Sequence, residues 1–259
     1  MLVVVLPIFN EASGISEFLH ELNENLDIFS TIFVAVDDKS TDDTNTILTR
    51  MKGDGFPIVI IQNEVNKGHG YSVITGIKKA IDLNPDSILL CDGDGQFRGG
   101  EVKNLVNSQI QNPKSIVEGV RIGRNNPWFR RLISFNSGIL VWLVCGKMPS
   151  DANTPLRVLS RDNAMLLLNE IKDDCLTPNL VISAFSRVKK LEINELKLTS
   201  IPPRRSKDSI DQWKQRTDFL PSIRLIKFVF LATISWRYYA KQCLKFRKLN
   251  SAIGKRIDN

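Results

Sequence analysis

Short apolar runs alternate with helix-like stretches through the first ninety residues, and this rhythm limits the folds that the chain can adopt. The runs are continuous and rich in Val and Ile, as in strands buried on both faces of a sheet. They cover residues 2–6, 32–36, 57–61 and 87–91. The helix-like stretches between them cover about 13–26, 41–52 and 69–83. Strand, helix and strand repeated in this way predict an α/β fold with a mostly parallel sheet.

The rhythm changes after Asp94. The elements expected there are a helix at 101–110, a strand at 115–120 and a long helix at 128–145. Pro202 and Pro203 break the chain, and a mainly helical stretch should follow from about residue 209. We therefore predict a main domain at 1–208 and a basic, amphipathic helical extension at 209–259.

Positive charge gathers near the end of the sequence. The net charge is +7, but residues 201–259 hold 14 Lys and Arg against four Asp, a balance of +10. The first 200 residues therefore carry −3. A segment this basic predicts an anionic partner, which could be a membrane surface, a phosphate group or a nucleic acid. The alternative is a set of solvated helix faces with no partner.

Neither the cysteine spacing nor the hydropathy predicts secretion or a membrane span. The four cysteines form no CxxC pair, so we expect reduced thiols, as in a cytoplasmic protein. The first residues lack the charged start and the cleavage site of a signal peptide. The longest uncharged run, residues 132–146, falls short of the roughly 20 apolar residues that a membrane span needs.

Acidic side chains follow three of the four expected strands. Glu11 follows the first strand, Asp37 and Asp38 follow the second, and Asp92 and Asp94 follow the fourth. In an open parallel sheet, ligands bind beyond the carboxyl ends of the strands, so these acids should gather at one edge. Because like charges repel, such a cluster needs a cation or hydrogen-bond donors.

Asp92 and Asp94 are the strongest candidates for a metal-binding pair, because residues two apart in an extended chain point to the same side. Together with Gln96 they offer the hard oxygen ligands that Mg²⁺ or Mn²⁺ prefers. Gly93 and Gly95 would let the backbone approach a ligand closely. Such an ion could bridge diphosphate oxygens and neutralise a leaving group. The alternative is a simple turn, since Asp and Gly are also turn residues.

The segment at 66–70, NKGHG, resembles part of a dinucleotide fingerprint. However, Val73 stands where the third glycine is required, and the segment follows the third strand, so NAD binding is rejected. No Walker A motif is present. We interpret His69 as a loop residue, because two histidines cannot make a His-rich metal site.

Four motifs together resemble the family 2 glycosyltransferases with the GT-A fold, a Rossmann-like and mostly parallel sheet flanked by helices. They occur in the order and spacing of that family. The motifs are LPIFNE at 6–11, VDDKSTDDT at 36–44, NKGHG at 66–70 with Gly76, and DGDGQ at 92–96. The resemblance covers at least residues 2–96 and continues more weakly to about 207.

Within that family the chain is most similar to the dolichyl-phosphate mannose synthase and polyprenyl-phosphate sugar transferase branch. The shared features after the acidic motif are Gly119 with Arg121, the pair Arg130 and Arg131 before a helix, and Asp151 followed by Arg157. The resemblance implies that the nucleotide is held by Pro7, Phe9, Glu11, Val36, Asp38, Asp92 and Gly93. It implies that the metal is held by Asp92, Asp94 and Gln96, and that Arg121 lies near the phosphates.

The resemblance also implies an inverting transfer of a sugar from a GDP- or UDP-linked donor to a dolichyl or undecaprenyl phosphate. Asp94, Arg121 and Asp151 are then the catalytic candidates. The metal and Arg121 would stabilise the departing diphosphate. A phosphate acceptor is already an anion, whereas a hydroxyl acceptor needs a base, for which Asp151 is the candidate. Asp151 could instead be a simple cap.

The chain departs from the family pattern at three places, which bear on the acceptor and not on the donor chemistry. Lys39 stands where the family usually has Gly, TPLR at 154–157 replaces Thr-Gly-Phe-Arg, and a late Arg-x-x-Gly-x-Ser motif is compressed to RRSK at 204–207.

Two apolar runs, 132–146 and 225–236, are flanked by cations and are too short to span a bilayer. This pattern is typical of helices that lie on an anionic membrane, and it predicts a peripheral protein at the cytoplasmic face. The candidates for the acceptor phosphate are Arg130, Arg131, Arg204 and Arg205, since guanidinium binds phosphate bidentately. The alternative is that both runs are core helices.

Three other functions stay open. The first is transfer to a hydroxyl of a cell-surface glycan, and the second is a nucleotidyltransferase that releases pyrophosphate. The third is a basic nucleic-acid-binding protein without catalysis. No helix-turn-helix, zinc-finger or RNP signature is present, so we expect no nucleic-acid partner.

Overall fold

The computed structural model describes residues 1–123, 127–204 and 220–257, with side chains as far as residue 249. Its strands form one seven-stranded sheet. They are β1 (Leu2–Ile8), β2 (Thr31–Asp37), β3 (Ile58–Gln62), β4 (Ser87–Leu90), β5 (Ile116–Ile122), β6 (Arg157–Ser160) and β7 (Ile193–Thr199). All five strands predicted from the sequence are confirmed to within a few residues.

The strand order is β3-β2-β1-β4-β6-β5-β7. Neighbouring strands are parallel except at β6, which runs antiparallel to both β4 and β5. The predicted α/β class with a mostly parallel sheet is therefore confirmed. Strand β6 begins at the edge where β4 and β5 end, since Arg157 pairs with Leu90 on one side and with Glu118 on the other.

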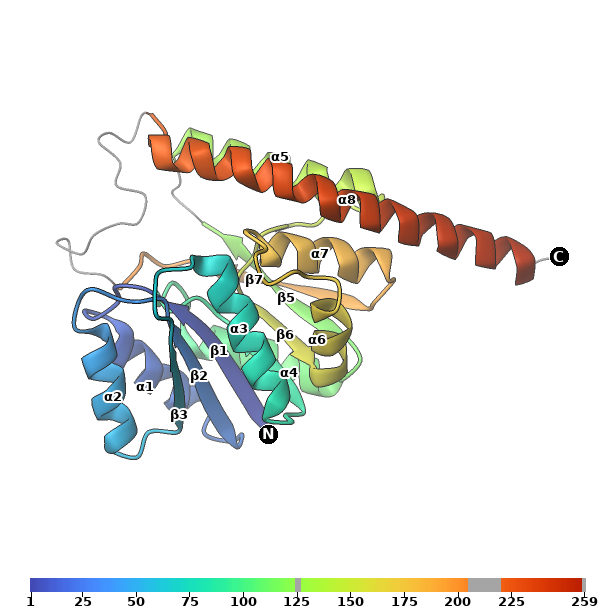
Figure 1. Ribbon diagram of the computed structural model, residues 1–259. Coiled ribbons are helices and arrows are strands. Elements are labelled where there is room, and N and C mark those ends of the chain that lie inside the picture. The colour runs from blue at the N-terminus through green and yellow to red at the C-terminus, as the bar shows by residue number, and fades with distance from the viewer. Residues whose placement is uncertain (124–126, 205–219, 258–259) are drawn as a thin grey trace.

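Helices cover both faces of the sheet (Figure 1). One face carries α1 (Ile15–Asn25), α2 (Thr44–Gly53) and α4 (Gly99–Gln111), and the other carries α3 (His69–Asp82), α6 (Arg161–Leu168) and α7 (Pro178–Val188). Alternate residues of β1 contribute to the two cores, Val3 and Val5 to the α3 side and Val4 and Leu6 to the α1 side. This two-sided burial explains why the first strand reads as a continuous apolar run.

Gly76 allows α3 to pack closely on β1. A Cβ at this position would lie 2.3 Å from Cγ1 of Val5, much closer than atoms in contact can approach. The glycine therefore brings the start of α3 near the carboxyl end of β1.

Two further helices, α5 (Trp128–Cys145) and α8 (Ile223–Ile257), lie side by side outside α7 (Figure 1). Helix α5 begins and ends as the sequence predicts. Helix α8 buries Trp236, Tyr239 and Cys243 in the core on the α7 side. The predicted boundary at 208 lies outside the described residues. In the part of the chain that the structure describes, no helix is long and apolar enough to cross a membrane.

Candidate functional site

The carboxyl ends of β1, β2, β3 and β4 meet at one edge of the sheet, where β6 begins. The loops at this edge carry most of the residues that the sequence singled out. A small pocket lies among them, with about 190 Å³ of empty volume that includes open solvent. Its polar side is formed by Asp92 and Asn179, and Pro7 and Pro155 lie beside them.

The loops after β1 and β2 are joined by hydrogen bonds. Asn10 accepts from the backbone N–H of Thr41 at 2.8 Å, and its own N–H donates to Oγ of Ser40 at 3.0 Å. The N–H of Glu11 donates to Oγ1 of Thr44 at 2.9 Å. Glu11 is thereby held in a buried position at the site edge.

The other nucleotide candidates on these two strands differ in their exposure. Pro7 and Phe9 are half-buried at the edge, and Pro7 lines the pocket. Val36 is fully buried against Gly76 of α3. Its side chain therefore belongs to the core and not to the surface of the site.

Asp37 and Asp38 order the neighbouring loops. Asp38 accepts from the backbone N–H groups of Lys67 and Gly68 at 2.8 and 2.7 Å, and from Nδ2 of Asn63 at 2.7 Å. Asp37 accepts from the N–H of Ser40 at 2.9 Å. Both carboxylates are at most 2% exposed. The sequence predicts that Asp38 contacts the nucleotide, and the structure shows that its carboxylate fixes the loop before α3.

The DGDGQ segment is a turn at Gly93 and Asp94, with a φ of 70° at Gly95, and not the extended chain that the prediction of a shared side assumes. Asp92, Asp94 and Gln96 are partly exposed, and they alternate with the buried Gly93 and Gly95. A Cβ on Gly93 would lie 2.8 Å from Cγ1 of Ile8 in β1, so the glycine is needed for the close approach of these two strand ends.

His69 is the first residue of α3, not a loop residue. The reason is that Asp38 holds Lys67 and Gly68, and Gly68 has a φ of 90°, so the helix begins directly afterwards. Nε2 of His69 lies 3.6 Å from Oδ1 of Asp92. This contact could not be predicted from the sequence, because the two residues belong to different strand–helix units.

The acidic pair fits a hard divalent cation. Among the described residues, no group of three or more His, Cys, Asp and Glu side chains is arranged to hold a metal by itself. Asp92, Asp94 and Gln96 instead offer two carboxylates and one amide oxygen. Mg²⁺ is typically bound by one or two carboxylates, with its other positions filled by water and substrate phosphates. The residues present therefore suit an ion that is completed by a diphosphate.

Arg121 and Asp151, the other two catalytic candidates, form a bidentate ion pair. Nε of Arg121 lies 2.7 Å from Oδ2 of Asp151, and Nη2 lies 3.0 Å from Oδ1. Nη2 also donates to the carbonyl of Asn153 at 3.0 Å. Both side chains are about nine-tenths buried. Asp151 therefore serves first to orient Arg121 and the loop at 151–156.

Of the four arginines predicted for an acceptor phosphate, the structure describes three, and these lie in two different parts of the fold. Arg130 is half-buried and Arg131 is exposed on the first turn of α5. Arg204 lies behind the DGDGQ loop, where Nη1 is 2.8 Å from Glu17 and Nη2 contacts Glu21. Arg205 lies outside the described residues.

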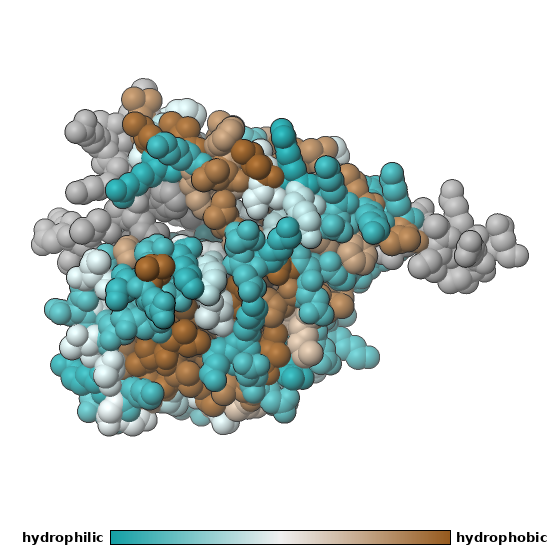
Figure 2. Space-filling model, viewed as in Figure 1, coloured by the Kyte–Doolittle hydropathy of each residue, from teal (hydrophilic) through white to brown (hydrophobic). Residues whose placement is uncertain are grey.

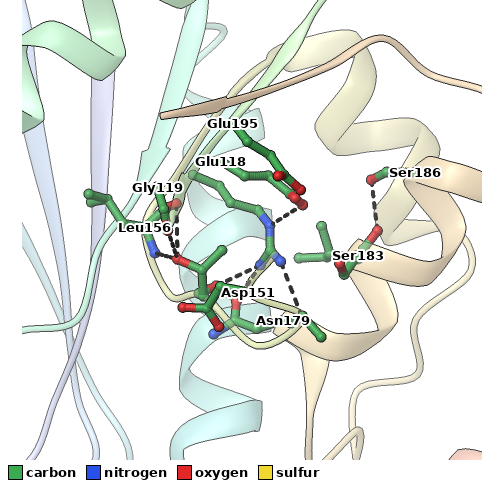
Figure 3. Close-up of polar contacts among 12 residues, drawn as sticks. Glu118, Gly119, Asp151, Leu156, Asn179, Ser183, Ser186 and Glu195 are labelled. Atoms are coloured by element: carbon green, nitrogen blue, oxygen red, sulfur yellow. Dashed lines mark hydrogen bonds and ion pairs between the residues drawn. The ribbon is translucent and has the colours of Figure 1, made fainter. Parts of the chain in front are cut away.

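A buried charge network lies beneath the loop at 151–156 (Figure 3). Nε of Arg157 is 3.0 Å from Glu118, and Nη2 of Arg187 is 2.8 Å from the same carboxylate. Arg187 also contacts Glu195 at 3.0 Å. Burial raises the pKa of Glu118, but Arg157 and then Arg187 outweigh this effect and lower that pKa overall. The family resemblance includes Arg157 as a motif position, but its full burial is not predictable from the sequence, because charged residues are rarely fully buried unless they are paired.

Comparison with known proteins adds a family match. A sequence model described as glycosyl transferase family 2 matches residues 3–165. The UDP-N-acetylglucosamine–dolichyl-phosphate N-acetylglucosaminyltransferase of Methanococcus voltae is 24% identical over 78% of this chain and 86% of its own length. An undecaprenyl-phosphate 4-deoxy-4-formamido-L-arabinose transferase of Sodalis glossinidius is 29% identical over 64% of this chain. The match spans 52% of that relative.

Solved structures share the fold. Glucosyl-3-phosphoglycerate synthase of Mycobacterium tuberculosis in complex with uridine diphosphate has a TM-score of 0.63 and 15% identity. The match covers 93% of this chain and 80% of that chain. The same enzyme has also been crystallised with Mn²⁺ and UDP-glucose. These neighbours have the GT-A fold, which confirms the architecture that the sequence motifs predict.

Proposed function

This chain belongs to glycosyl transferase family 2, and from this premise we propose that it moves a sugar from a UDP-linked donor to a polyprenyl phosphate. It is a glycosyltransferase with the GT-A fold. Two relatives are named for transfer to dolichyl phosphate and to undecaprenyl phosphate, which supports a lipid phosphate as acceptor.

The observation that carries the proposal is the position of Asp92 and Asp94. Glu11, Asp37 and Asp38 are buried at the same edge. The side chain of Asp92, in contrast, is 30% exposed and lines the pocket, and Asp94, two residues later in the same loop, is partly exposed. The site therefore keeps its accessible acids where a donor diphosphate would lie at the carboxyl ends of the strands.

A bound Mg²⁺ or Mn²⁺ would supply charge neutralisation for the leaving diphosphate. On this proposal the ion is held by Asp92, Asp94 and Gln96. The family resemblance places Glu11 and Asp38 beside the nucleotide. Since Asp38 holds the loop at Lys67, its contribution includes the shape of the nucleotide pocket.

The Arg121–Asp151 pair favours a phosphate acceptor over a hydroxyl. A general base needs a carboxylate oxygen within reach of the proton that it removes. Both oxygens of Asp151 accept hydrogen bonds from Arg121. A phosphate oxygen is already an anion and needs no such base. Arg121, whose side chain is about nine-tenths buried near the end of β5, would then contribute positive charge toward the reacting phosphates.

UDP is the better supported nucleotide. The relative from Methanococcus voltae is named for a UDP-sugar, and the synthase from Mycobacterium tuberculosis was crystallised with UDP. The direct experiment is a screen of UDP- and GDP-sugars for metal-dependent transfer to a polyprenyl phosphate. Release of nucleoside diphosphate that depends on the lipid phosphate supports the proposal. Release that depends instead on a glycan hydroxyl contradicts it.

An exposed apolar surface on α5 and α8 supports binding of the protein to a membrane surface. The exposed residues on α5 are Trp128, Leu132, Phe135, Trp142 and Leu143, and those on the first half of α8 include Ile223, Ile226, Phe230, Leu231 and Ile234. Figure 2 shows apolar side chains gathered over the first turns of α8. Exposed apolar side chains gathered in this way mark an interaction site.

Exposed cations accompany this apolar surface. Arg131 lies on α5, and Arg224, Lys227 and Arg237 lie on α8. Apolar burial and attraction to anionic headgroups add together in interfacial helices, at about 1 kcal/mol for each Lys or Arg near the surface. We therefore propose that α5 and α8 rest on an anionic membrane, with the cytoplasmic face as the expected side.

Co-sedimentation with vesicles tests the membrane surface. Wild-type protein should bind vesicles that contain anionic lipid and bind neutral vesicles less. The variant Phe135→Asp/Phe230→Asp should lose binding by tenfold or more, because two exposed apolar anchors become charged (about 1.4 kcal/mol per tenfold change). Ile28→Asp is the matched control, since Ile28 is 63% exposed but lies next to α1. Equal binding by all three proteins would contradict the assignment.

A further inference from the structure

We propose that Arg157 is a positioning residue for sugar transfer, which holds the loop at 151–156 and Asn179 in place opposite Asp92. The inference rests on the proposed function. Arg157 is fully buried and touches none of the residues expected to hold the donor, so its role is exerted through the groups that it binds.

The guanidinium of Arg157 joins three parts of the fold (Figure 3). Nε donates to Glu118 of β5 at 3.0 Å. Nη1 donates to the carbonyl of Thr154 at 2.7 Å and to Oδ1 of Asn179 in α7 at 3.4 Å. Nη2 donates to the carbonyl of Ala152 at 3.5 Å. One side chain therefore reaches two carbonyls of the loop and the first turn of a helix, and its shortest contact is to the carbonyl of Thr154.

The groups fixed in this way form one wall of the site. Pro155 and Asn179 line the pocket together with Asp92. The same loop carries Asp151, which orients Arg121. Arg157 also pairs in the sheet with Leu90, two residues before Asp92. The distance between the acidic pair and the opposite wall is thus set through this residue.

Stability alone is a weak reason for the network. Removing charges from water is costly, and well-packed apolar side chains often serve as well or better than a buried ion pair. A guanidinium has a rigid fork of donors that can hold two carbonyls, an amide and a carboxylate at once, which neither an apolar side chain nor a lysine can do. The geometry of the loop is what this arginine provides.

Two variants test the role in the full-length protein. Arg157→Lys keeps the charge and loses the fork. Glu118→Gln/Arg157→Gln removes one charge of each sign and leaves the pair of Arg187 with Glu195. We expect both to fold, and to lower kcat/KM for the polyprenyl phosphate about 100-fold, since a displacement of about 1 Å costs that much. The Kd for UDP should change less than threefold, because the nucleotide lies on the other side.

Arg161→Lys is the matched control. Arg161 lies just beyond the opposite end of β6, where its Nε donates to the carbonyl of Ile81 at 3.1 Å. This variant should leave both constants unchanged. Hydrogen–deuterium exchange at residues 151–156 should rise in the two test variants and stay at the wild-type level in the control.

The outcomes that overturn each proposal differ. Wild-type protein that ignores the polyprenyl phosphate overturns the proposed function. Unchanged exchange at 151–156 in both test variants overturns the role of Arg157, whatever the acceptor is. Loss of UDP affinity in parallel with transfer also overturns it, because a general structural defect would lower both constants together.

Discussion

The two walls of the site are built in different ways. The wall at the ends of β1, β2, β3 and β4 consists of loops that follow consecutive strands, and its buried acids Asp37 and Asp38 accept hydrogen bonds from backbone N–H groups of the loops after β2 and β3. The opposite wall is the loop before β6, which Arg157 of β6 contacts directly. Arg157 is paired with Glu118 of β5, and Glu118 also binds Arg187 of α7. Acidic side chains hold the loops of the first wall in place, and the buried guanidinium of Arg157 holds the loop of the second.

This comparison shows that residue type alone does not reveal a role. Asp38 and Asp92 both follow buried strands, yet Asp38 is 2% exposed and holds a loop, whereas the side chain of Asp92 is 30% exposed and lines the pocket. Exposure and hydrogen-bond partners separate the structural acid from the one that can meet a ligand.

Asp94→Asn should lower turnover of the donor by about 100-fold or more, because a charge that helps to hold the cation is lost where leaving-group charge develops. The fold should survive, since Asp94 is only partly buried. Steady-state kinetics together with a thermal melt measure both effects. EDTA should inhibit the wild type to a similar extent. Activity that is retained after either the substitution or EDTA would contradict metal binding at this wall.

Asp38→Asn should weaken UDP binding about tenfold and also lower the free energy of unfolding by about 1–3 kcal/mol. The physical reason is that two backbone N–H groups, of Lys67 and Gly68, would lose part of a charged acceptor in a buried position. Calorimetry and urea denaturation measure the two quantities. The exposed Asp43 lies in the same segment, and Asp43→Asn is the control. Weaker binding with unchanged stability would mean that Asp38 acts by direct contact alone.

Glu118→Gln should change how stability depends on pH. Because the folded state lowers the pKa of Glu118, this carboxylate stabilises the fold above the unfolded pKa of about 4.5, and the contribution is lost as pH falls through the folded value. The wild type should therefore be more stable than the variant at pH 7. The difference should shrink as pH falls below about 4.5. Urea denaturation from pH 7 to 3.5 would show this, and a constant difference would contradict it. The exposed Glu24→Gln is the control.

Lys39→Gly should have the smallest effect, a gain of about 0.5–1 kcal/mol in stability. Lys39 has a φ of 63°, in the left-handed region where a side chain is strained and glycine is not. This explains why the family usually has glycine there. Lys52→Gly, inside α2, should instead cost about 1 kcal/mol. Thermal melts of both variants measure the contrast, and destabilisation by Lys39→Gly would show that its side chain is needed.

The first wall could be predicted from the sequence because its signals are local. Buried parallel strands read as apolar runs, and the acids follow directly at their ends, so the DGDGQ segment was placed at the correct edge. The sequence did not show which of these acids hold a loop and which line the pocket. That depends on which backbone N–H groups turn toward them, as at Lys67 and Gly68.

The second wall could not be predicted because its contacts are distant in the chain. Strand β6 has only four residues and begins with an arginine, so it resembles a loop more than a central strand. Its pairing with β4 joins residues about seventy positions apart. Strand β6 lies between β4 and β5 in the sheet. This position allows Arg121 to pair with Asp151 and buries Arg157 beside Glu118.

The place of β6 in the sheet has a consequence for the growing chain. Strands β4 and β5 follow one another in the sequence, but they have no common hydrogen-bonded neighbour until residues 157–160 have been synthesised. Until then each presents an open, apolar edge that other chains could pair with. The strand that closes the sheet also brings Arg157 into place. A chain truncated before β6 would lack the second wall, and a chain truncated directly after β6 would still lack Asn179 and Arg187 of α7.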